Sequence, residues 1–171
     1  MNNQLPEVRL RAIEPEDLDA LYAIENDRTV WNLGVTNVPY SRYVLHDYIA
    51  NAKNDIYADG QVRLLVEGEG GAVTGIVDLV DFDPRNNKAE VGIVIRSEYR
   101  HQGYGTAAMV QLLAYASSVL HLHQVYAVIS EGNGVAVSLF ERLGFRQASV
   151  LADWLYDGKE YSDAVLLQTF L

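Results

Sequence analysis

Three segments rich in β-branched residues, between Gln61 and Arg96, constrain the fold of this chain more than any other feature. They read QVRLLVEG, AVTGIVDLVDF and KAEVGIVIR, and the short stretches EGEGG and DPRNN separate them. β-branched residues favour strands, and glycine, asparagine and aspartate between strands favour hairpin turns. The pattern therefore predicts an antiparallel meander of three strands.

Helices and further strands are expected on both sides of this meander. The segment VRLRAI at 8–13 alternates like a half-buried strand, and 124–130 is a nearly apolar strand that we expect to be buried on both faces. Two strands joined at Asp157–Gly158 end the chain. Helices are predicted over residues 14–27, 42–53, 105–120 and 133–144, the second capped by Ser41 and the last by Asn133. We expect one α/β domain over residues 1–171, built around a mixed sheet.

Composition excludes several classes of protein. The 171 residues contain no cysteine, which removes disulfides, thiol nucleophiles and thiolate metal sites. A formal net charge of −10 argues against nucleic acid as a partner; it suits a cationic partner or serves only solubility. No apolar segment is long enough to span a membrane, and the N-terminus does not resemble a signal peptide. We expect a cytoplasmic protein with no membrane partner and no metal site.

The stretch YRHQGYGTAAMVQ at 99–111 joins the third meander strand to a helix. Glycine lets backbone N–H groups approach a ligand, and the N-terminus of a helix attracts anions. The stretch lacks the spacing and the lysine of a Walker loop, and it lacks the third glycine of a dinucleotide-binding loop. A site for another diphosphate is therefore predicted, with a plain tight turn as the alternative.

The residues of this loop resemble a known motif. Arg100, His101, Gln102, Gly103, Tyr104 and Gly105 are similar to the R/Q-x-x-G-x-G/A motif of the GNAT N-acetyltransferases. RLRAIEPEDLDALY resembles the opening strand and helix of that family, and LHLHQVYAVISEGNGVAVSLFERLGF resembles a later strand and helix. DWLYDGKEYSDAVLL resembles the closing hairpin of the branch that contains spermidine and ribosomal-protein acetyltransferases.

The resemblance implies a GNAT-like fold, with a mostly antiparallel sheet splayed between its fourth and fifth strands and flanked by helices. It implies acetyl-CoA as co-substrate, its pyrophosphate held by the loop from Arg100 to Thr106. The thioester and pantetheine would lie between the strand holding Ile93, Val94 and Ile95 and the strand at 124–130, with backbone N–H groups near Val94 as oxyanion donors. Asn133 would bind the pantetheine arm or a bridging water, or serve only as a helix cap.

For catalysis, Glu90 is the leading candidate base, because related enzymes often use a glutamate here to take the amine proton through water. By strand alternation its side chain lies on the same face as Gly92 and Val94. The alternative is an ordinary charged strand residue, and Asp78 and Asp153 are second choices for the base. Phe140 occupies the position of a tyrosine that protonates the thiolate in many members, and it has no proton to give. Solvent would then act as the acid, or Ser138 if the helix is irregular, because in a regular helix Ser138 points elsewhere.

The acceptor groove of the family is built from the first two helices, their loop and the closing hairpin. In this chain the residues expected to contact the acceptor are Glu25, Trp31, Tyr40 and Asp78. Aromatic rings and carboxylates suit a cation, although the rings also suit a core or groove wall. The favoured function is acetyl transfer to a polyamine-like small amine. Transfer to a protein N-terminus, of the ribosomal-protein type, is the second hypothesis, and a non-catalytic acyl-CoA-binding module is the third. A homo-oligomer is compatible with each of them.

Overall fold

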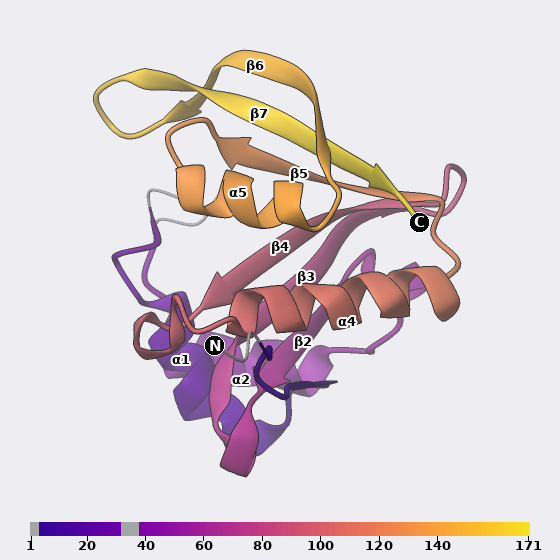
Figure 1. The fold of residues 1–171 in the computed structure, drawn as a ribbon. Helices are drawn as coiled ribbons and strands as arrows, with labels where there is room; N and C mark the ends of the chain where they lie inside the picture. The colour runs from indigo at the N-terminus through magenta and orange to yellow at the C-terminus, as the bar shows by residue number, and fades with distance from the viewer. Residues whose placement is uncertain (1–3, 32–37) are drawn as a thin grey trace.

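A computed structural model describes residues 4–31 and 38–171 of the chain. Within these two ranges, seven strands form one mixed sheet in the order β1-β2-β3-β4-β5-β7-β6. Their bounds are β1 Arg9–Arg11, β2 Val62–Glu67, β3 Val73–Asp83, β4 Lys88–Ile95, β5 Gln124–Ser130, β6 Arg146–Tyr156 and β7 Tyr161–Phe170. Every neighbouring pair is antiparallel except β4 and β5, which are parallel (Figure 1). The predicted meander, mixed sheet and closing hairpin are confirmed.

The helices follow the predicted order with small changes at their ends. Their bounds are α1 Leu18–Glu25, α2 Arg42–Asn51, α3 Ile56–Asp59, α4 Tyr104–Ser118 and α5 Gly134–Arg142, and 3-10 turns lie at Pro15–Asp17, Glu69–Gly71 and Ser97–Tyr99. The Ser41 side chain accepts a hydrogen bond from the Val44 N–H, as its expected cap role requires. Helix α3 was not predicted, because four residues are too few to show a helical periodicity.

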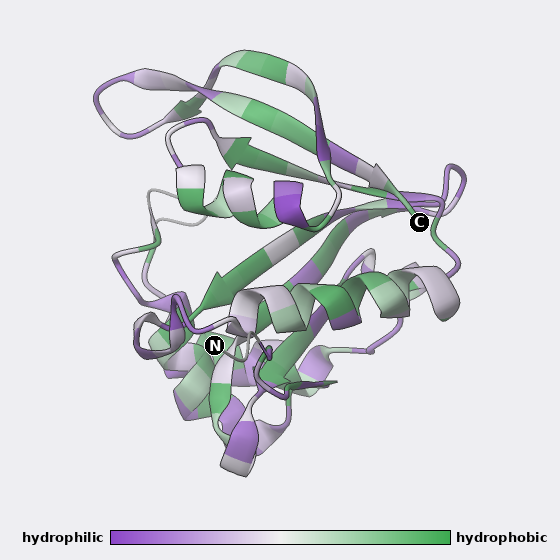
Figure 2. Ribbon diagram, viewed as in Figure 1, coloured by the Kyte–Doolittle hydropathy of each residue, from purple (hydrophilic) through white to green (hydrophobic). Residues whose placement is uncertain are grey.

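One face of the sheet carries the larger hydrophobic core. Helices α4 and α5 pack on it, and Figure 2 shows the apolar strands β3, β4 and β5 behind them. The side chains of Leu79, Met109, Leu112 and Leu167 are fully buried there. Because successive side chains of a strand point to opposite faces, every second residue of each strand contributes to this core. It fixes α4 and α5, and the loops before them, against the C-terminal end of β4.

The opposite face is covered unevenly. Leu21 and Ile24 of α1 and Leu45 of α2 pack on Leu65 and Ile76 of β2 and β3. Strand β5 alternates instead between half-buried residues on this face and buried residues on the core face. The prediction that 124–130 is buried on both faces is therefore wrong. The reason is that α1 and α2 pack mainly on β2 and β3, which leaves the β4–β5 part of this face accessible.

Strands β4 and β5 pair over only a short distance. The parallel register joins Lys88–Glu90 to Gln124–Tyr126, and no later pair is made between the described strands. Strand β5 stays paired with β7 along its whole length, so the C-terminal half of β4 diverges from β5. This divergence is the predicted splay between the fourth and fifth strands, and the gap between the two ribbons is visible in Figure 1.

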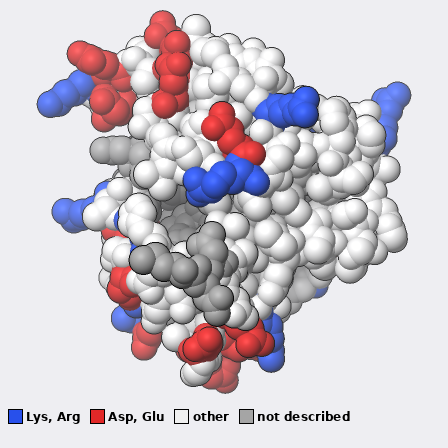
Figure 3. Space-filling view, viewed as in Figure 1, with Lys and Arg blue, Asp and Glu red and all other residues white. Residues whose placement is uncertain are grey.

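Charge and apolar surface are distributed unevenly on the outside. In the view of Figure 3 the surface over α4 is largely uncharged, and charged side chains gather at the tip of the β6–β7 hairpin. Among residues 4–31 and 38–171, no helix has the length and apolar character needed to cross a membrane.

Candidate active site

The loop between β4 and α4 is a compact turn with two left-handed residues. After the 3-10 turn at Ser97–Tyr99, His101 adopts φ 60° and Gly103 adopts φ 90°. Gly103 is the N-cap of α4, and a Cβ added there would lie 2.9 Å from Cδ of Pro6. Glycine at 103 therefore serves both the backbone conformation and the close approach of the N-terminal segment.

The start of α4 has the features of an anion site. The first N–H groups of an α-helix, here from Tyr104 to Thr106, have no acceptor within the helix, and the helix dipole favours negative charge beside them. A Cβ at Gly105 would meet Leu139 of α5 and the side chains of Ile93 and Ile95 at 3.6–3.8 Å. Those are ordinary contacts, so alanine would also fit, as in the motif that this loop resembles. Gly105 thus faces the space between β4 and α5.

Arg100 connects this loop to its surroundings. Its Nε donates a 2.8 Å hydrogen bond to the Ile95 carbonyl, and its Nη2 lies 3.5 Å from an oxygen of Asp27, which follows α1. A third of the Arg100 side chain is exposed, so the guanidinium can reach a bound anion. Gln102, the next predicted polar residue, donates through Nε2 to the Glu98 carbonyl and thereby stabilises the turn.

The direction of the β4 backbone decides which amides face the gap. The Arg96 N–H donates to the Thr74 carbonyl of the segment paired with β4, and Val94 is two residues earlier in the same register. In an antiparallel pair alternate residues share this orientation, so the Val94 N–H also faces β3. The N–H groups of Ile93 and Ile95 then face the gap on the β5 side. The expected oxyanion donors near Val94 are therefore best assigned to its neighbours.

Glu90 stands where β4 and β5 separate. Its carboxylate accepts a hydrogen bond of 3.3 Å from the backbone N–H of Val128. The side chain is half-buried, and burial, with a smaller contribution from nearby Asp81, raises the pKa of Glu90 above its ordinary value. Tyr126 lies directly opposite on β5, and burial followed by the Glu90 charge raises the pKa of its phenol. A carboxylate with a raised pKa next to an open gap can accept a proton from an amine.

Asp78 and Glu25, both expected to contact the acceptor, are brought together by a residue that the sequence reasoning missed. Arg63 of β2 donates through Nε to Asp78 and through Nη1 to Glu25, both at 2.7 Å. Burial raises the pKa of Glu25 above its ordinary value, and the charge of Arg63 opposes this. An arginine inside an otherwise apolar strand needs a counter-ion, and that requirement was the available signal. Asp78, committed to Arg63, is a poor second choice for the base.

The aromatic residues expected in the groove lie at its edge. The Trp31 Nε1–H donates to the Glu25 carbonyl at 3.2 Å, and the Tyr40 backbone is held by the Asn26 side chain at 2.9 and 3.1 Å. Tyr40 also packs against the core under α1 and α2. The part of the expected groove between them, residues 32–37, lies outside the described residues. Asp153 is exposed on β6, separated from β5 by β7, and so is far from Glu90.

Helix α5 carries the two remaining predicted site residues. The Asn133 side-chain oxygen accepts from the Ala136 N–H at 3.2 Å, so its cap role is confirmed. Its Nδ2 donates to none of the residues that the structure describes, which leaves that donor for a ligand. Phe140 is 3% exposed and packs edge-to-face on Phe145, with ring centroids 4.9 Å apart. Ser138 is exposed and points away from this core.

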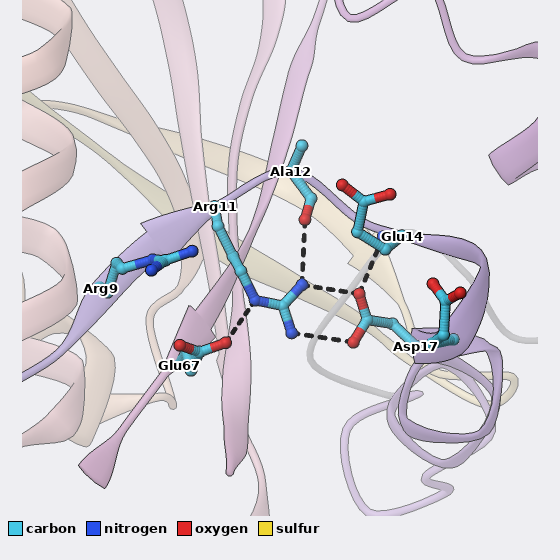
Figure 4. A pocket seen from close by; sticks show the side chains of 7 residues that line it. Arg9, Arg11, Ala12, Glu14, Asp17 and Glu67 are labelled. Carbon is cyan, nitrogen blue, oxygen red and sulfur yellow. Dashed lines mark hydrogen bonds and ion pairs between the residues drawn. The ribbon is translucent and has the colours of Figure 1, made fainter. Parts of the chain in front are cut away.

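Two surface hollows flank α1. One of about 290 Å³ lies between the end of α1 and the end of β4, beside the gap, and is lined by Ala23, Ile24, Asp27, Val94, Arg96, Ser97 and Glu98. The other, of about 370 Å³, lies beside β1, and Figure 4 shows that Arg11 and its ion-pair partners Asp17 and Glu67 line it. Only the first hollow adjoins the loop that we expect to bind the cofactor.

Comparison with known proteins gives a consistent result. The model of the acetyltransferase (GNAT) domain matches residues 7–146. The spermidine N(1)-acetyltransferase of Escherichia coli strain K12 is 28% identical over 167 residues, which cover 95% of this chain and 86% of that protein. The putative ribosomal N-acetyltransferase YdaF of Bacillus subtilis strain 168 is 30% identical over 165 residues, which cover 92% and 88%.

Solved structures agree on the fold. The spermidine N-acetyltransferase from Vibrio cholerae in complex with CoA and spermine superimposes with a TM-score of 0.87 at 24% identity, over 95% of each chain. A dodecameric structure of the Vibrio cholerae enzyme gives a TM-score of 0.81 at 26% identity, over 95% of this chain and 93% of that one. The family match, the splayed sheet and the glycine loop coincide on the same residues. This chain belongs to the GNAT acetyltransferase family and is an N-acetyltransferase whose co-substrate is acetyl-CoA.

Proposed function

We propose that this enzyme transfers the acetyl group of acetyl-CoA to a primary amine of a polyamine-like small molecule. The observation that carries the proposal is the half-buried Glu90 carboxylate at the divergence of β4 and β5, on the open face of the sheet. A cationic acceptor suits a negatively charged, partly dehydrated group more than a neutral acceptor does. The likeness to spermidine N(1)-acetyltransferases over nearly the whole chain supports the same class of acceptor.

The cofactor site follows from the loop and the gap. The N-terminus of α4 and Arg100 bind the pyrophosphate, and the pantetheine arm lies between the diverging strands β4 and β5. The Ile93 N–H, which faces the gap, is the proposed donor to the thioester oxygen as negative charge develops there. The free Nδ2 of Asn133 donates to the pantetheine arm. Acetyl-CoA supplies the activated acyl group, and the protein supplies position and charge.

Proton transfer begins at Glu90. The acceptor arrives as an ammonium ion, and Glu90 takes one proton from it, directly or through one water, so that the nitrogen lone pair becomes nucleophilic. The nitrogen then attacks the thioester carbon and loses its second proton to solvent, and the carbon–sulfur bond breaks with both electrons going to sulfur. Burial moves the pKa of Glu90 toward neutral pH, which makes its carboxylate a stronger base than that of an exposed glutamate.

The thiolate leaves without an obvious protein acid. Phe140 is a buried hydrocarbon ring in the core, and exposed Ser138 is turned away. Solvent therefore supplies the proton to sulfur. A thiolate is a good enough leaving group to depart before it is protonated, but the help of a general acid is lost. We expect turnover to be slower than it would be with a phenol at this position.

A protein N-terminus is the second candidate acceptor. Phe140 favours this acceptor. The spermidine enzymes of the family carry an acid tyrosine at this position, whereas ribosomal-protein acetyltransferases commonly lack it. The 30% identity to the putative ribosomal N-acetyltransferase YdaF points the same way. A peptide acceptor would need a groove for several residues, whereas a small amine needs only the surroundings of Glu90.

The deciding experiment measures CoA release with a thiol reagent. The chain has no cysteine, so the protein adds no background. Spermidine, spermine, 1,4-diaminobutane and short peptides with free N-termini are compared as acceptors, each with the wild type and with Glu90→Gln. The proposal is supported if the wild type acetylates the small amines and Glu90→Gln does not. Turnover of the peptides alone would replace the polyamine with a protein N-terminus.

We also propose that the enzyme assembles with copies of itself through the β6–β7 hairpin. Trp154, Tyr156 and Tyr161 on this hairpin are each about 60% exposed. Large aromatic side chains gathered on one surface are typical of protein interfaces. The dodecameric structure of the Vibrio cholerae relative supports self-assembly. Sedimentation of the wild type and of Trp154→Glu with Tyr161→Glu tests it, and a wild-type monomer would contradict it.

A further inference from the structure

On the face of the sheet that α1 and α2 cover, one arginine is held by two carboxylates from two other elements. Arg63 of β2 contacts Asp78 of β3 through Nε at 2.7 Å and Nη2 at 3.4 Å, and it contacts Glu25 at the end of α1 through Nη1 at 2.7 Å. The exposed fractions of the side chains are 27% for Arg63 and 16% for each carboxylate. The guanidinium carbon also lies 5.8 Å from the centre of the Tyr48 ring. The cluster is therefore partly shielded and carries a net charge of −1.

This cluster lies beside Glu90 on the same face. Asp78 pairs with Gly92 in the β3–β4 register, and Glu90 is the next residue of β4 on that face. Gly92 has no side chain, and a Cβ there would lie 3.6 Å from Oδ2 of Asp78. The bare backbone of Gly92 therefore lies between the Asp78 carboxylate and the candidate base along β4, while Val80 of β3 lies opposite Glu90.

The spacing of Asp78 and Glu90 along the sheet suits a diamine. With strands about 4.8 Å apart and two residues spanning about 7 Å, the Cα atoms of Asp78 and Glu90 are roughly 8 Å apart. Nitrogens separated by three or four methylene groups lie about 5–6 Å apart in an extended chain. A diamine with its reacting nitrogen at Glu90 would thus bring its second ammonium to the Glu25–Asp78 pair. That position already holds the guanidinium of Arg63.

We propose that Arg63 determines acceptor specificity by acting as a built-in cation, which occupies the Glu25–Asp78 pair and keeps a second ammonium of the acceptor out of it. Two partly buried carboxylates without a counter-ion would bind a cation or take up a proton. With Arg63 present, the enzyme binds one ammonium group of the acceptor at Glu90. A second ammonium group gains no binding energy from the Glu25–Asp78 pair. The inference rests on the proposed function, because it places the acceptor beside Glu90.

The test compares two acceptors that differ only in the second ammonium, 1,4-diaminobutane and butylamine. Arg63→Met removes the charge and keeps much of the side-chain length, and Arg63→Lys keeps the charge. The ratio of kcat/KM for the diamine to that for the monoamine should rise about tenfold or more in Arg63→Met, the scale of one charged hydrogen bond. It should stay near the wild-type ratio in Arg63→Lys. Adding Glu25→Gln to Arg63→Met should reduce the gain again, because one carboxylate is lost.

Arg11 provides a matched control. It is held in the same way by two carboxylates, Asp17 at 2.7 and 2.9 Å and Glu67 at 2.5 Å (Figure 4). Arg11 is the last residue of β1, which β2 and β3 separate from β4 and Glu90. Arg11→Met should lower the melting temperature as the loss of a structural cation does, and leave the acceptor ratio unchanged. An equal ratio in Arg63→Met and the wild type, or an equal change in Arg11→Met, would overturn the proposal.

A binding measurement separates this proposal from the proposed function. Without acetyl-CoA, 1,4-diaminobutane should raise the melting temperature of Arg63→Met more than butylamine does, and the two amines should act alike on the wild type. If the wild type acetylates no small amine, the proposed function fails, whatever the melting shifts are. If it does acetylate them and Arg63→Met shows no selective shift with the diamine, the role of Arg63 fails alone.

Discussion

The carboxylate of Glu90 accepts a hydrogen bond from the backbone N–H of Val128 at 3.3 Å, across the point where β4 and β5 separate. Val128 is two residues beyond Tyr126, the last residue of β5 that pairs with β4. A side chain therefore satisfies an amide that the parallel ladder no longer reaches. The same side chain is the proposed base, so the end of strand pairing and the start of the reaction site coincide at one residue.

Replacing Glu90 by glutamine should abolish most of the activity while keeping the fold. The amide oxygen can still accept from Val128, but it cannot take a proton from the amine. General-base catalysis contributes about 10²–10⁴-fold, and kcat should fall by that order. In the wild type, kcat/KM should rise with pH through a Glu90 pKa above the ordinary 4.5, because only the ionised form is a base. A pH profile from 4 to 9 checks both points, and an unchanged profile in Glu90→Gln would exclude Glu90 as the base.

The stability of the wild type should depend on pH through the same group. The folded-state pKa of Glu90 is raised, so its contribution is most favourable below the unfolded value and is lost as pH rises through the folded pKa. As the pH rises from acid to neutral, the free energy of unfolding of Glu90→Gln should therefore increase relative to that of the wild type. Asp81→Asn is the companion variant: it removes a neighbouring negative charge, so the acid limb of activity should move to lower pH. Denaturant unfolding at several pH values measures the first effect.

Giving helix α5 a phenol should speed the reaction. Phe140→Tyr places a proton donor where the family resemblance implies an acid, and kcat should rise several-fold to about tenfold if thiolate departure limits turnover. Phe145→Tyr adds the same hydroxyl to the ring that packs on Phe140 and serves as the control for simple core disturbance. Both should lose stability, because each ring is at most 3% exposed. Equal kcat in Phe140→Tyr and the wild type would show that protonation of sulfur is not limiting.

Reversing the charge of Arg100 should weaken cofactor binding. Arg100 lies in the loop that leads into α4 with a third of its side chain exposed, and a charged hydrogen bond to a phosphate is worth about 1.5–3 kcal/mol, or roughly tenfold to a hundredfold in Kd. Arg100→Glu should raise the Kd of CoA at least that much by calorimetry. Arg146→Glu, on the distant strand β6, should leave it unchanged. An unaltered Kd in Arg100→Glu would displace the proposed pyrophosphate site.

Asn133 can be divided into its two roles. Asn133→Ser keeps an oxygen able to cap α5 and loses the amide donor, whereas Asn133→Ala loses both. Asn133→Ala should therefore lower the free energy of unfolding by about 1 kcal/mol, and Asn133→Ser by much less. If Nδ2 binds the pantetheine arm, both variants should raise the Kd of CoA by a similar factor. A raised Kd in the alanine variant only would leave Asn133 as a helix cap.

The sequence by itself determined the order of the elements and the chemistry of one loop. β-branched runs separated by turn residues predict the meander, because strand and turn preferences act over a few neighbouring residues. The loop from Arg100 to Thr106 and the caps Ser41 and Asn133 are equally local, since each depends on residues within one turn of a helix. Strand alternation likewise placed Glu90 and Gly92 on one face.

The tertiary structure alone decided which groups meet. Arg63 is 38 residues from Glu25 and 15 from Asp78, so no local pattern could show that it holds both carboxylates. The exposure of one face of β5 depended on where α1 and α2 pack, and apolar composition alone does not reveal this. The direction of the Ile93 and Val94 amides required the register between β3 and β4, because only pairing decides which neighbour each amide faces. Composition and spacing along the chain specify elements, and long-range packing specifies the site.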